Sequence, residues 1–219
     1  MKIFTKREIL PLALILLVVL VSFYVYPILP EKVPSHWNAM GEIDDWQSRD
    51  FSVLFFPGVI IGIYILMLLI PLIDPLRKNY QKFILPYFWF RTILVSFLVL
   101  IYFYSLWAAL GSELNINYLI LPAISVLFFS MGFFMPKIKK NYFVGIRTPW
   151  TLASEPVWEK THQFGGKCFM LAGIIFLLAA FFPDYFVQIM ILIILVAALL
   201  PITYSYFIFK KVEGFKDNN

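Results

Sequence analysis

Two polar intervals hold most of the side chains in this chain that could do chemistry. The first, residues 30–50, contains His36, Glu42 and Asp44, side-chain types found in metal sites and ligand-binding loops. One histidine without a second nitrogen or sulfur ligand makes zinc a weak interpretation. Two basic and five acidic residues in the interval favour recognition of a cationic or amphipathic peptide. A solvated turn, held at the lipid headgroups by its tryptophans, is the competing interpretation. The candidate recognition residues are His36, Trp37, Asn38, Gly41, Glu42, Asp44 and Trp46.

The second interval, residues 141–162, carries Arg147 and His162. The guanidinium of Arg147 could bind a lipid phosphate, pair with a nearby glutamate or contact a cytoplasmic partner, and tying the loop together is the simplest of its roles. No serine or cysteine nucleophile pattern accompanies His162, so we expect it to pack or cap rather than catalyse. No enzymatic activity, metal or cofactor is predicted. The candidate partner-binding residues are Asn141, Gly145, Arg147, Thr148, Pro149, Trp150, Thr151, Glu155, Trp158, Thr161 and His162.

The elements that must position these intervals are apolar. The chain is 61% hydrophobic and 14% charged, whereas soluble domains are roughly half apolar and a quarter charged. Six apolar runs are long enough to cross a bilayer as helices. We expect these spans at residues 9–29, 51–73, 86–110, 118–135, 168–182 and 185–209. The predicted fold class is therefore an all-α polytopic membrane protein that forms a single integral membrane domain over residues 1–219.

The distribution of positive charge predicts the orientation of the spans. With six spans, sixteen of the 18 Lys and Arg residues fall on one side, and only Lys32 and Arg49 fall on the other. Positive residues accumulate on the cytoplasmic side, so both termini and residues 141–162 are predicted to be cytoplasmic and residues 30–50 external. The basic balance then reflects topology and contact with anionic lipid, and no direct nucleic-acid binding is expected.

A short interfacial helix is expected before the fifth span. Ser154 is a favourable N-cap, and the helix should run from there to about residue 164. Trp158 and His162 are four residues apart, so they share one face of this helix. The glycine pair at 165–166 is expected to permit a bend into the fifth span.

Both intervals resemble motifs of one known family. The segment from Gly145 to His162, G-I-R-T-P-W-T-L-A-S-E-P-V-W-E-K-T-H, looks like the hallmark of the SdpI family of bacterial plasma-membrane proteins. The first interval, Y-P-I-L-P-E-K-V-P-S-H-W-N-A-M-G-E-I-D-D-W, resembles the amino-terminal module of unknown function that accompanies it. The resemblance implies an amino-terminal module at residues 8–60 and an SdpI-like carboxy-terminal module at 118–210 with a cytoplasmic loop at 136–167.

The resemblance also implies a function. The family is named after an immunity protein that protects its producer from a secreted, membrane-active, sporulation-delaying toxin peptide and draws a cytoplasmic transcriptional repressor to the membrane. This chain would then be an immunity and signalling protein whose partners are the lipid bilayer, the toxin peptide and the repressor. From the predicted topology we assign toxin sensing to residues 30–50 and the cytoplasmic output to residues 145–162.

Two other classes of function remain open. No ionisable residue falls in the middle of any run, which counts against an ion-coupled transporter, but a small passive transporter or a lipid-handling protein remains an alternative. A membrane enzyme would need acidic or nucleophilic groups that converge in one cleft, and the sequence places no such set.

Overall fold

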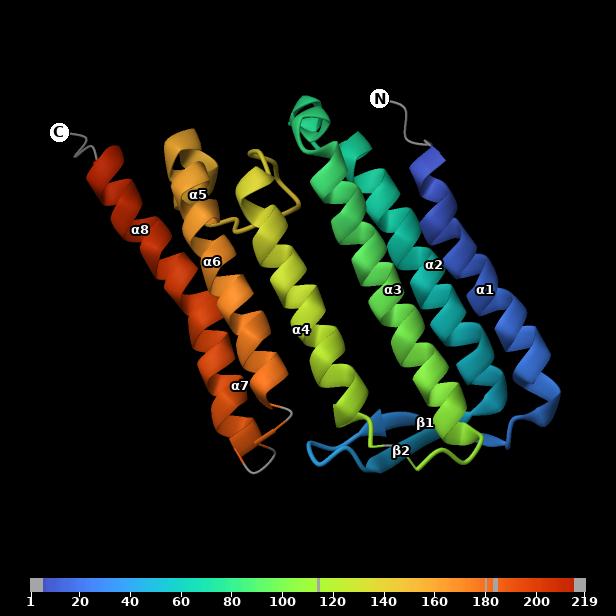
Figure 1. Cartoon of the computed structure of the whole chain (residues 1–219). Coiled ribbons are helices and arrows are strands. Elements are labelled where there is room, and N and C mark those ends of the chain that lie inside the picture. Colours follow the sequence, from blue (N-terminus) through green and yellow to red (C-terminus); the bar gives the residue numbers. More distant parts are fainter. Residues whose placement is uncertain (1–5, 114, 180, 183–184, 215–219) are drawn as a thin grey trace. The chain divides into compact units, whose positions relative to one another are not determined.

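The structure, a computed structural model, describes residues 6–113, 115–179, 181–182 and 185–214. Six of its helical segments are long and apolar enough to cross a membrane, as predicted (Figure 1). Hydrocarbon offers the backbone no hydrogen-bond partner, so apolar runs of this length satisfy their own backbone groups as helices. The segments are Lys6–Ile28, Arg49–Ile73, Ile84–Ala109, Asn117–Lys137, Glu155–Ala179 and Phe186–Val212.

These segments are built from shorter elements. The main helices are α1 (Ile9–Val25), α2 (Arg49–Ile73), α3 (Ile84–Ala109), α4 (Asn117–Phe134), α5 (Pro149–Ala153), α6 (Glu155–Ala179), α7 (Phe186–Ile194) and α8 (Leu200–Val212). A π-helical turn, Leu195–Leu199, joins α7 to α8. Short 3-10 helices are η1 (Lys6–Glu8), η2 (Tyr26–Ile28), η3 (Arg77–Lys82) and η4 (Met135–Lys137).

The chain divides into two compact units. Unit 1 comprises Met1–Leu69 and Arg91–Ala123, and unit 2 comprises Ile70–Phe90 and Ile124–Asn219. The core of unit 1 is formed by apolar side chains of α1, α2 and α3, with Val18, Ile60 and Val95 all almost fully buried. Ser22 and Tyr102 share a hydrogen bond of 2.7 Å inside this core. Ser22 Oγ also donates to the carbonyl oxygen of Val18 at 2.7 Å, so it accepts from Tyr102. The bond links α1 to α3 and satisfies the buried hydroxyl of Tyr102.

Unit 1 also contains a β-hairpin in the first polar interval, where a turn was expected but no paired strands. Strands β1 (Lys32–Trp37) and β2 (Ile43–Ser48) pair antiparallel between the end of α1 and the start of α2 (Figure 1). The register shifts on both sides of His36, which marks a bulge. The hairpin gives the first polar interval a fixed backbone on which its side chains are displayed.

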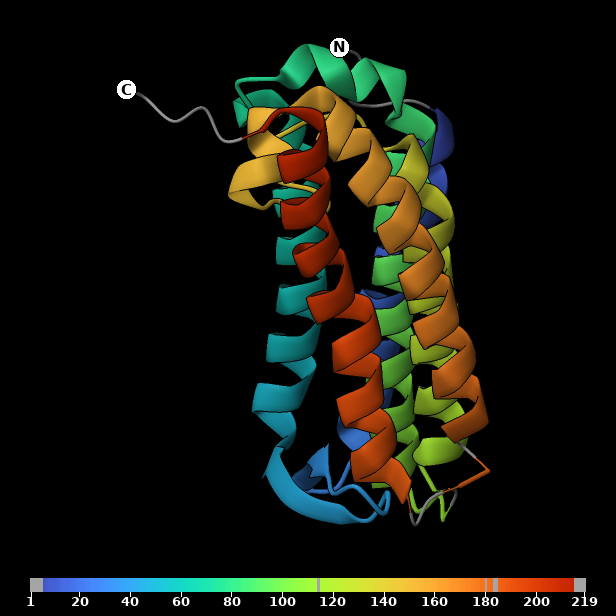
Figure 2. The ribbon, with the colours of Figure 1, turned by 90° about the vertical axis from the view of Figure 1, so that its left-hand side faces the viewer.

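In unit 2, α6 packs along α8, and Figure 2 shows the two helices side by side. The expected bend at Gly165–Gly166 is absent, because α6 is continuous from Glu155 to Ala179. A Cβ added to Gly166 would lie 2.8 Å from the carbonyl oxygen of Gly132, so this glycine permits a close approach to α4. The separate short helix is α5, and the helix expected from Ser154 to about residue 164 is the first part of α6.

Candidate functional site

The hairpin of unit 1 is fixed to the end of α3. Ser105 Oγ donates a hydrogen bond of 2.6 Å to the carbonyl oxygen of Pro34. The ring of Trp37 packs against that of Tyr104 with 5.6 Å between centroids. Trp37, one of the predicted recognition residues, therefore helps to dock the hairpin on α3.

Asn38, Gly41 and Glu42 build the turn between the strands. Asn38 Oδ1 accepts from the amides of Met40 and Glu42 at 2.9 and 3.1 Å, and Asn38 Nδ2 donates to Glu42 Oε2 at 2.9 Å. Gly41 has a φ of +81°, a conformation that favours glycine. Asn115 Nδ2 donates to the carbonyl oxygen of Met40 at 2.7 Å. These contacts hold the turn in one conformation, so the three predicted residues shape the display surface.

The remaining predicted residues of the hairpin face outward. His36 Nδ1 lies 2.6 Å from Asp44 Oδ1, and their side chains are 67% and 41% exposed. Trp46 is 48% exposed. An open depression along β2 is lined by Asp44, Asp45 and Trp46 together with Glu31. This face combines an exposed indole with several carboxylates, which suits a cationic amphipathic ligand.

The geometry of the hairpin does not favour a metal site. The carboxylate of Glu42 accepts from Asn38, while His36 pairs with Asp44. Among the described residues no three His, Cys, Asp or Glu side chains are grouped closely enough to hold an ion.

In unit 2, Asn141 fixes the start of the second polar interval. The side chain is fully buried, and Oδ1 accepts from the amides of Phe143 and Val144 at 2.9 and 2.7 Å. Nδ2 donates to the carbonyl oxygens of Lys139 and Val144 at 2.9 and 3.0 Å. Four bonds saturate most of this amide, so its observed role is to shape the loop.

Asp74 ties the loop after α2 to the second interval. It is 2% exposed, and its Oδ2 accepts from the amide of Tyr142 at 2.9 Å and the hydroxyl of Tyr80 at 3.1 Å. Its Oδ1 accepts from the amide of Leu76 at 2.6 Å. Burial, reinforced by the Asp74 carboxylate, raises the pKa of the Tyr80 phenol. The phenol therefore stays protonated at neutral pH and remains a donor to Asp74.

Gly145, Trp158 and His162 form one packed cluster, the histidine cluster. Both ring nitrogens of His162 are engaged: Nε2 accepts from the amide of Ile146 at 3.1 Å, and Nδ1 lies 2.8 Å from the carbonyl oxygen of Trp158. This pairing requires a neutral ring with the proton on Nδ1. The indole of Trp158 stacks on the imidazole at 4.0 Å and donates to the carbonyl oxygen of Ile138 at 2.9 Å. Both nitrogens of His162 are therefore used in hydrogen bonds that hold the loop, and its observed role is structural.

Thr148 and Thr151 cap α5 reciprocally. Thr148 Oγ1 accepts from the amide of Thr151, Thr151 Oγ1 accepts from the amide of Thr148, and Pro149 follows at the first helical position. Thr148 Oγ1 also lies 3.0 Å from Ser205 Oγ of α8. The cap therefore joins the second interval to the last helix of the chain.

The structure separates the candidates of the second interval by exposure. Buried candidates are Asn141, Thr148, Thr151, Trp158, Thr161 and His162. Exposed candidates are Gly145, Arg147, Pro149 and Glu155, and Trp150 is half-buried. Arg147 Nη1 donates to the carbonyl oxygen of Tyr142 at 2.5 Å, which ties the loop together while the side chain remains exposed. Only the exposed group can meet a partner without rearrangement of the loop.

Sequence reasoning missed a buried ion pair in unit 1. Arg91 Nη2 contacts Glu8 Oε1, and the two side chains are 5% and 7% exposed. Tyr64 donates to the other carboxylate oxygen of Glu8 at 2.8 Å, so the cluster joins η1, α2 and α3. The sequence did offer one signal: Glu8 and Arg91 have opposite charges and lie at the ends of two spans, on the side of the membrane predicted to be cytoplasmic. The apolar runs gave no indication that these residues meet.

Comparison with known proteins agrees with this architecture. Residues 137–205 match the SdpI/YfhL protein family, and residues 13–61 match a domain of unknown function, DUF1648. The chain is 28% identical over 210 residues to the immunity protein SdpI of Bacillus subtilis (strain 168), covering 95% of this chain and 99% of that protein. No solved structure matches the chain.

Fold and site define a multi-span membrane protein with a polar hairpin in its amino-terminal part and a capped loop in its carboxy-terminal part. This loop is the second polar interval, residues 141–162, and is called the motif loop below. The whole hairpin lies inside the DUF1648 match, and the motif loop lies inside the SdpI match. The carboxy-terminal part of the chain is therefore similar to the SdpI/YfhL family, and its amino-terminal part is similar to DUF1648.

Proposed function

We propose that this chain is a membrane immunity protein that protects the cell carrying it from a secreted, membrane-active toxin peptide. The observation that carries the proposal is similarity to a protein named as an immunity protein across nearly the whole of both chains. The similarity covers 95% of this chain and 99% of that protein, and two family models match the regions that contain the two polar intervals.

The hairpin is the proposed sensor. Charge distribution along the sequence supports an orientation with both termini in the cytoplasm and the hairpin outside. His36, Asp44 and Trp46 would meet the toxin, because they are exposed on strands whose turn and attachment are fixed. Asn38 and Glu42 would hold the turn that presents them.

The motif loop is the proposed cytoplasmic output. Arg147, Pro149 and Glu155 would form the contact surface for a cytoplasmic transcriptional repressor, because they are the exposed charged or rigid members of the motif. The buried members, including the histidine cluster, would hold this surface in shape. A change in the packing of the histidine cluster would then alter the surface that the motif loop presents to the cytoplasm.

Protection is tested by expressing the chain in toxin-sensitive cells and challenging them with the sporulation-delaying toxin peptide. We expect survival with the wild-type chain and killing of cells that carry the empty vector. Western blotting of membranes against a terminal tag establishes that the chain is present. Undiminished killing at normal membrane levels would refute the proposed immunity.

The output is tested with a reporter of repressor release and two matched variants. Arg147 and Lys160 are both basic and exposed in unit 2. Arg147→Ala should abolish toxin-induced reporter activity at unchanged membrane levels, whereas Lys160→Ala should retain it. Equal reporter activity of the two variants would refute the proposal that Arg147 belongs to the output surface.

A further inference from the structure

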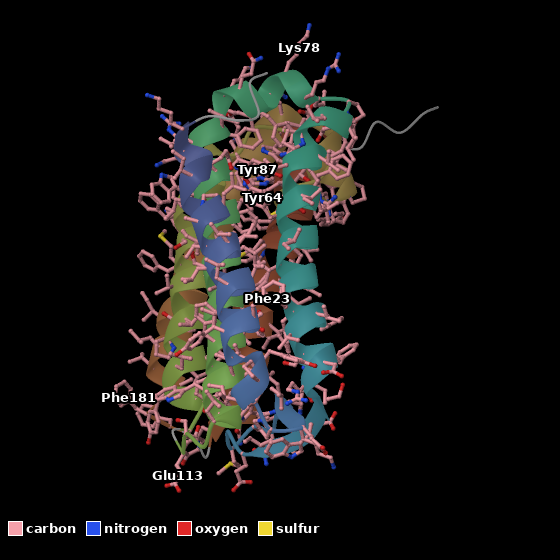
Figure 3. All side chains as sticks on the ribbon, turned by 90° about the vertical axis from the view of Figure 1, so that its right-hand side faces the viewer. Phe23, Tyr64, Lys78, Tyr87, Glu113 and Phe181 are labelled. Atoms are coloured by element: carbon pink, nitrogen blue, oxygen red, sulfur yellow. The ribbon has the colours of Figure 1, made fainter. Side chains whose placement is uncertain are left out.

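An open groove runs between α1 and α2 at the hairpin end of unit 1. Its volume is about 650 Å³, and its walls are mostly apolar. One wall comes from residues about one helical turn apart on α1 and the other from a similar row on α2. Figure 3 shows the two helices side by side, with Phe23 labelled. The residues that matter here are Ser22, Phe23, Tyr26, Asp50, Leu54 and Gly58.

The groove is open because no residue of unit 1 that the structure describes fills it. A Cβ added to Gly58 would meet no atom within 4 Å. Phe23 and Leu54 remain 76% and 74% exposed although they line the groove. Both are large apolar side chains, so the walls offer a packing surface to an apolar occupant.

The mouth of the groove is acidic. Asp50 lines both the groove and the open depression on β2, so the two spaces adjoin at this residue. Its side chain is 70% exposed, and its Oδ1 accepts from the hydroxyl of Tyr26 at 2.8 Å. Arg49 lies 3.9 Å from the same oxygen but donates to the carbonyl oxygen of Leu29. The depression still has four acidic residues against two basic ones, which leaves a net negative charge at the mouth.

We propose that the groove and the acidic depression together bind one cationic amphipathic peptide. Its apolar face lies along α1 and α2, and its basic side chains lie at Asp50 and on β2. The acidic mouth favours a basic peptide and disfavours the phosphate of a phospholipid, which would lie close to the carboxylates. This assignment rests on the proposed function for its identification of the peptide as the toxin, and it adds where and how that peptide binds.

Site-specific photo-crosslinking tests the location. Phe23 and Tyr24 are adjacent and 76% and 78% exposed, but only Phe23 lines the groove. The full chain in phosphatidylethanolamine–phosphatidylglycerol nanodiscs receives p-benzoylphenylalanine at either position and is irradiated with the sporulation-delaying toxin peptide. We expect at least about tenfold more peptide adduct at Phe23. Equal yields at the two positions, or a lipid adduct at Phe23 that the peptide does not displace, would overturn the proposal.

Filling the groove tests its contribution to affinity. Gly58 and Gly62 lie one turn apart on α2, a Cβ at either would meet no atom within 4 Å, and Gly62 does not line the groove. Gly58→Leu should weaken peptide binding in nanodiscs at least about tenfold, and Gly62→Leu should change it less than about twofold. Asp50→Asn keeps an acceptor for Tyr26 but removes the charge, so binding should weaken and lose most of its dependence on salt.

Binding and protection separate the two proposals. If the wild-type chain binds the peptide and Gly58→Leu weakens that binding, but the wild-type chain does not protect cells, the proposed immunity is refuted and the proposed binding groove is supported. If the wild-type chain protects cells, and Gly58→Leu binds the peptide and protects cells equally well, the proposed binding groove is refuted and the proposed immunity is supported.

Discussion

Replacing Gly145 with alanine should destabilise unit 2 through the histidine cluster. Gly145 has a φ of +107°, and an alanine there incurs a backbone cost of about 1–2 kcal/mol. The added Cβ would also lie 2.3 Å from His162 Nε2, the atom that accepts from the amide of Ile146. Displacing the imidazole leaves that amide unpaired, which costs about another 1–3 kcal/mol. The expected total is about 2–5 kcal/mol.

Two comparisons separate these contributions. Gly111 has a φ of +97°, and a Cβ there would meet no atom within 4 Å, so Gly111→Ala incurs the backbone cost alone. In a His162→Ala background the clash is removed, so adding Gly145→Ala should cost only about 1–2 kcal/mol more. Free energies of unfolding would be measured for the purified chains by SDS titration in mixed micelles, with tryptophan fluorescence as the signal.

The reasoning is refuted by either of two results. One is an equal loss of stability in Gly145→Ala and Gly111→Ala. The other is a Gly145→Ala effect that is unchanged when His162 is absent. Either result would mean that the contact with the imidazole contributes nothing to the stability of the loop.

Three further predictions use the same unfolding assay. Arg91→Met should lower stability by about 3–5 kcal/mol because it leaves the buried Glu8 carboxylate without its ion pair, and adding Glu8→Gln should recover part of the loss. Gly132→Ala should be destabilising because its Cβ would lie 2.4 Å from the carbonyl oxygen of Gly166, whereas Gly62→Ala, with open space around it, should be neutral or stabilising by up to about 1 kcal/mol. Thr148→Ala should cost about 1–2 kcal/mol through loss of the α5 cap.

The spans were predictable from the sequence because the length and apolarity of a run alone decide whether it can cross hydrocarbon as a helix. The capping role of Thr148 was not foreseen, although the preference of Pro149 for the first helical position was available to sequence reasoning. Asp74 illustrates what was missed: it bonds the amide of Tyr142, which is 68 residues away in the sequence. No local pattern reports such a pairing.

The glycine pair at 165–166 shows why a local interpretation failed. Glycine permits a bend, so the sequence suggested a break between an interfacial helix and the fifth span. In the structure Gly166 approaches the backbone of Gly132, and packing between helices keeps α6 continuous. In the hairpin the turn was expected, but the pairing of its two strands was not. One of the contacts that fix β1, the hydrogen bond from Ser105, comes from a residue distant in sequence.

The account depends most directly on the hairpin meeting the medium while the motif loop meets the cytoplasm. Glu42 and Glu155 are exposed acidic residues of these two segments, and the buried Cys168 can be replaced by alanine to provide a cysteine-free background. In intact cells, a membrane-impermeant maleimide should label Glu42→Cys, and it should label Glu155→Cys only after permeabilisation. Labelling of both positions from the same side of the membrane would contradict the account.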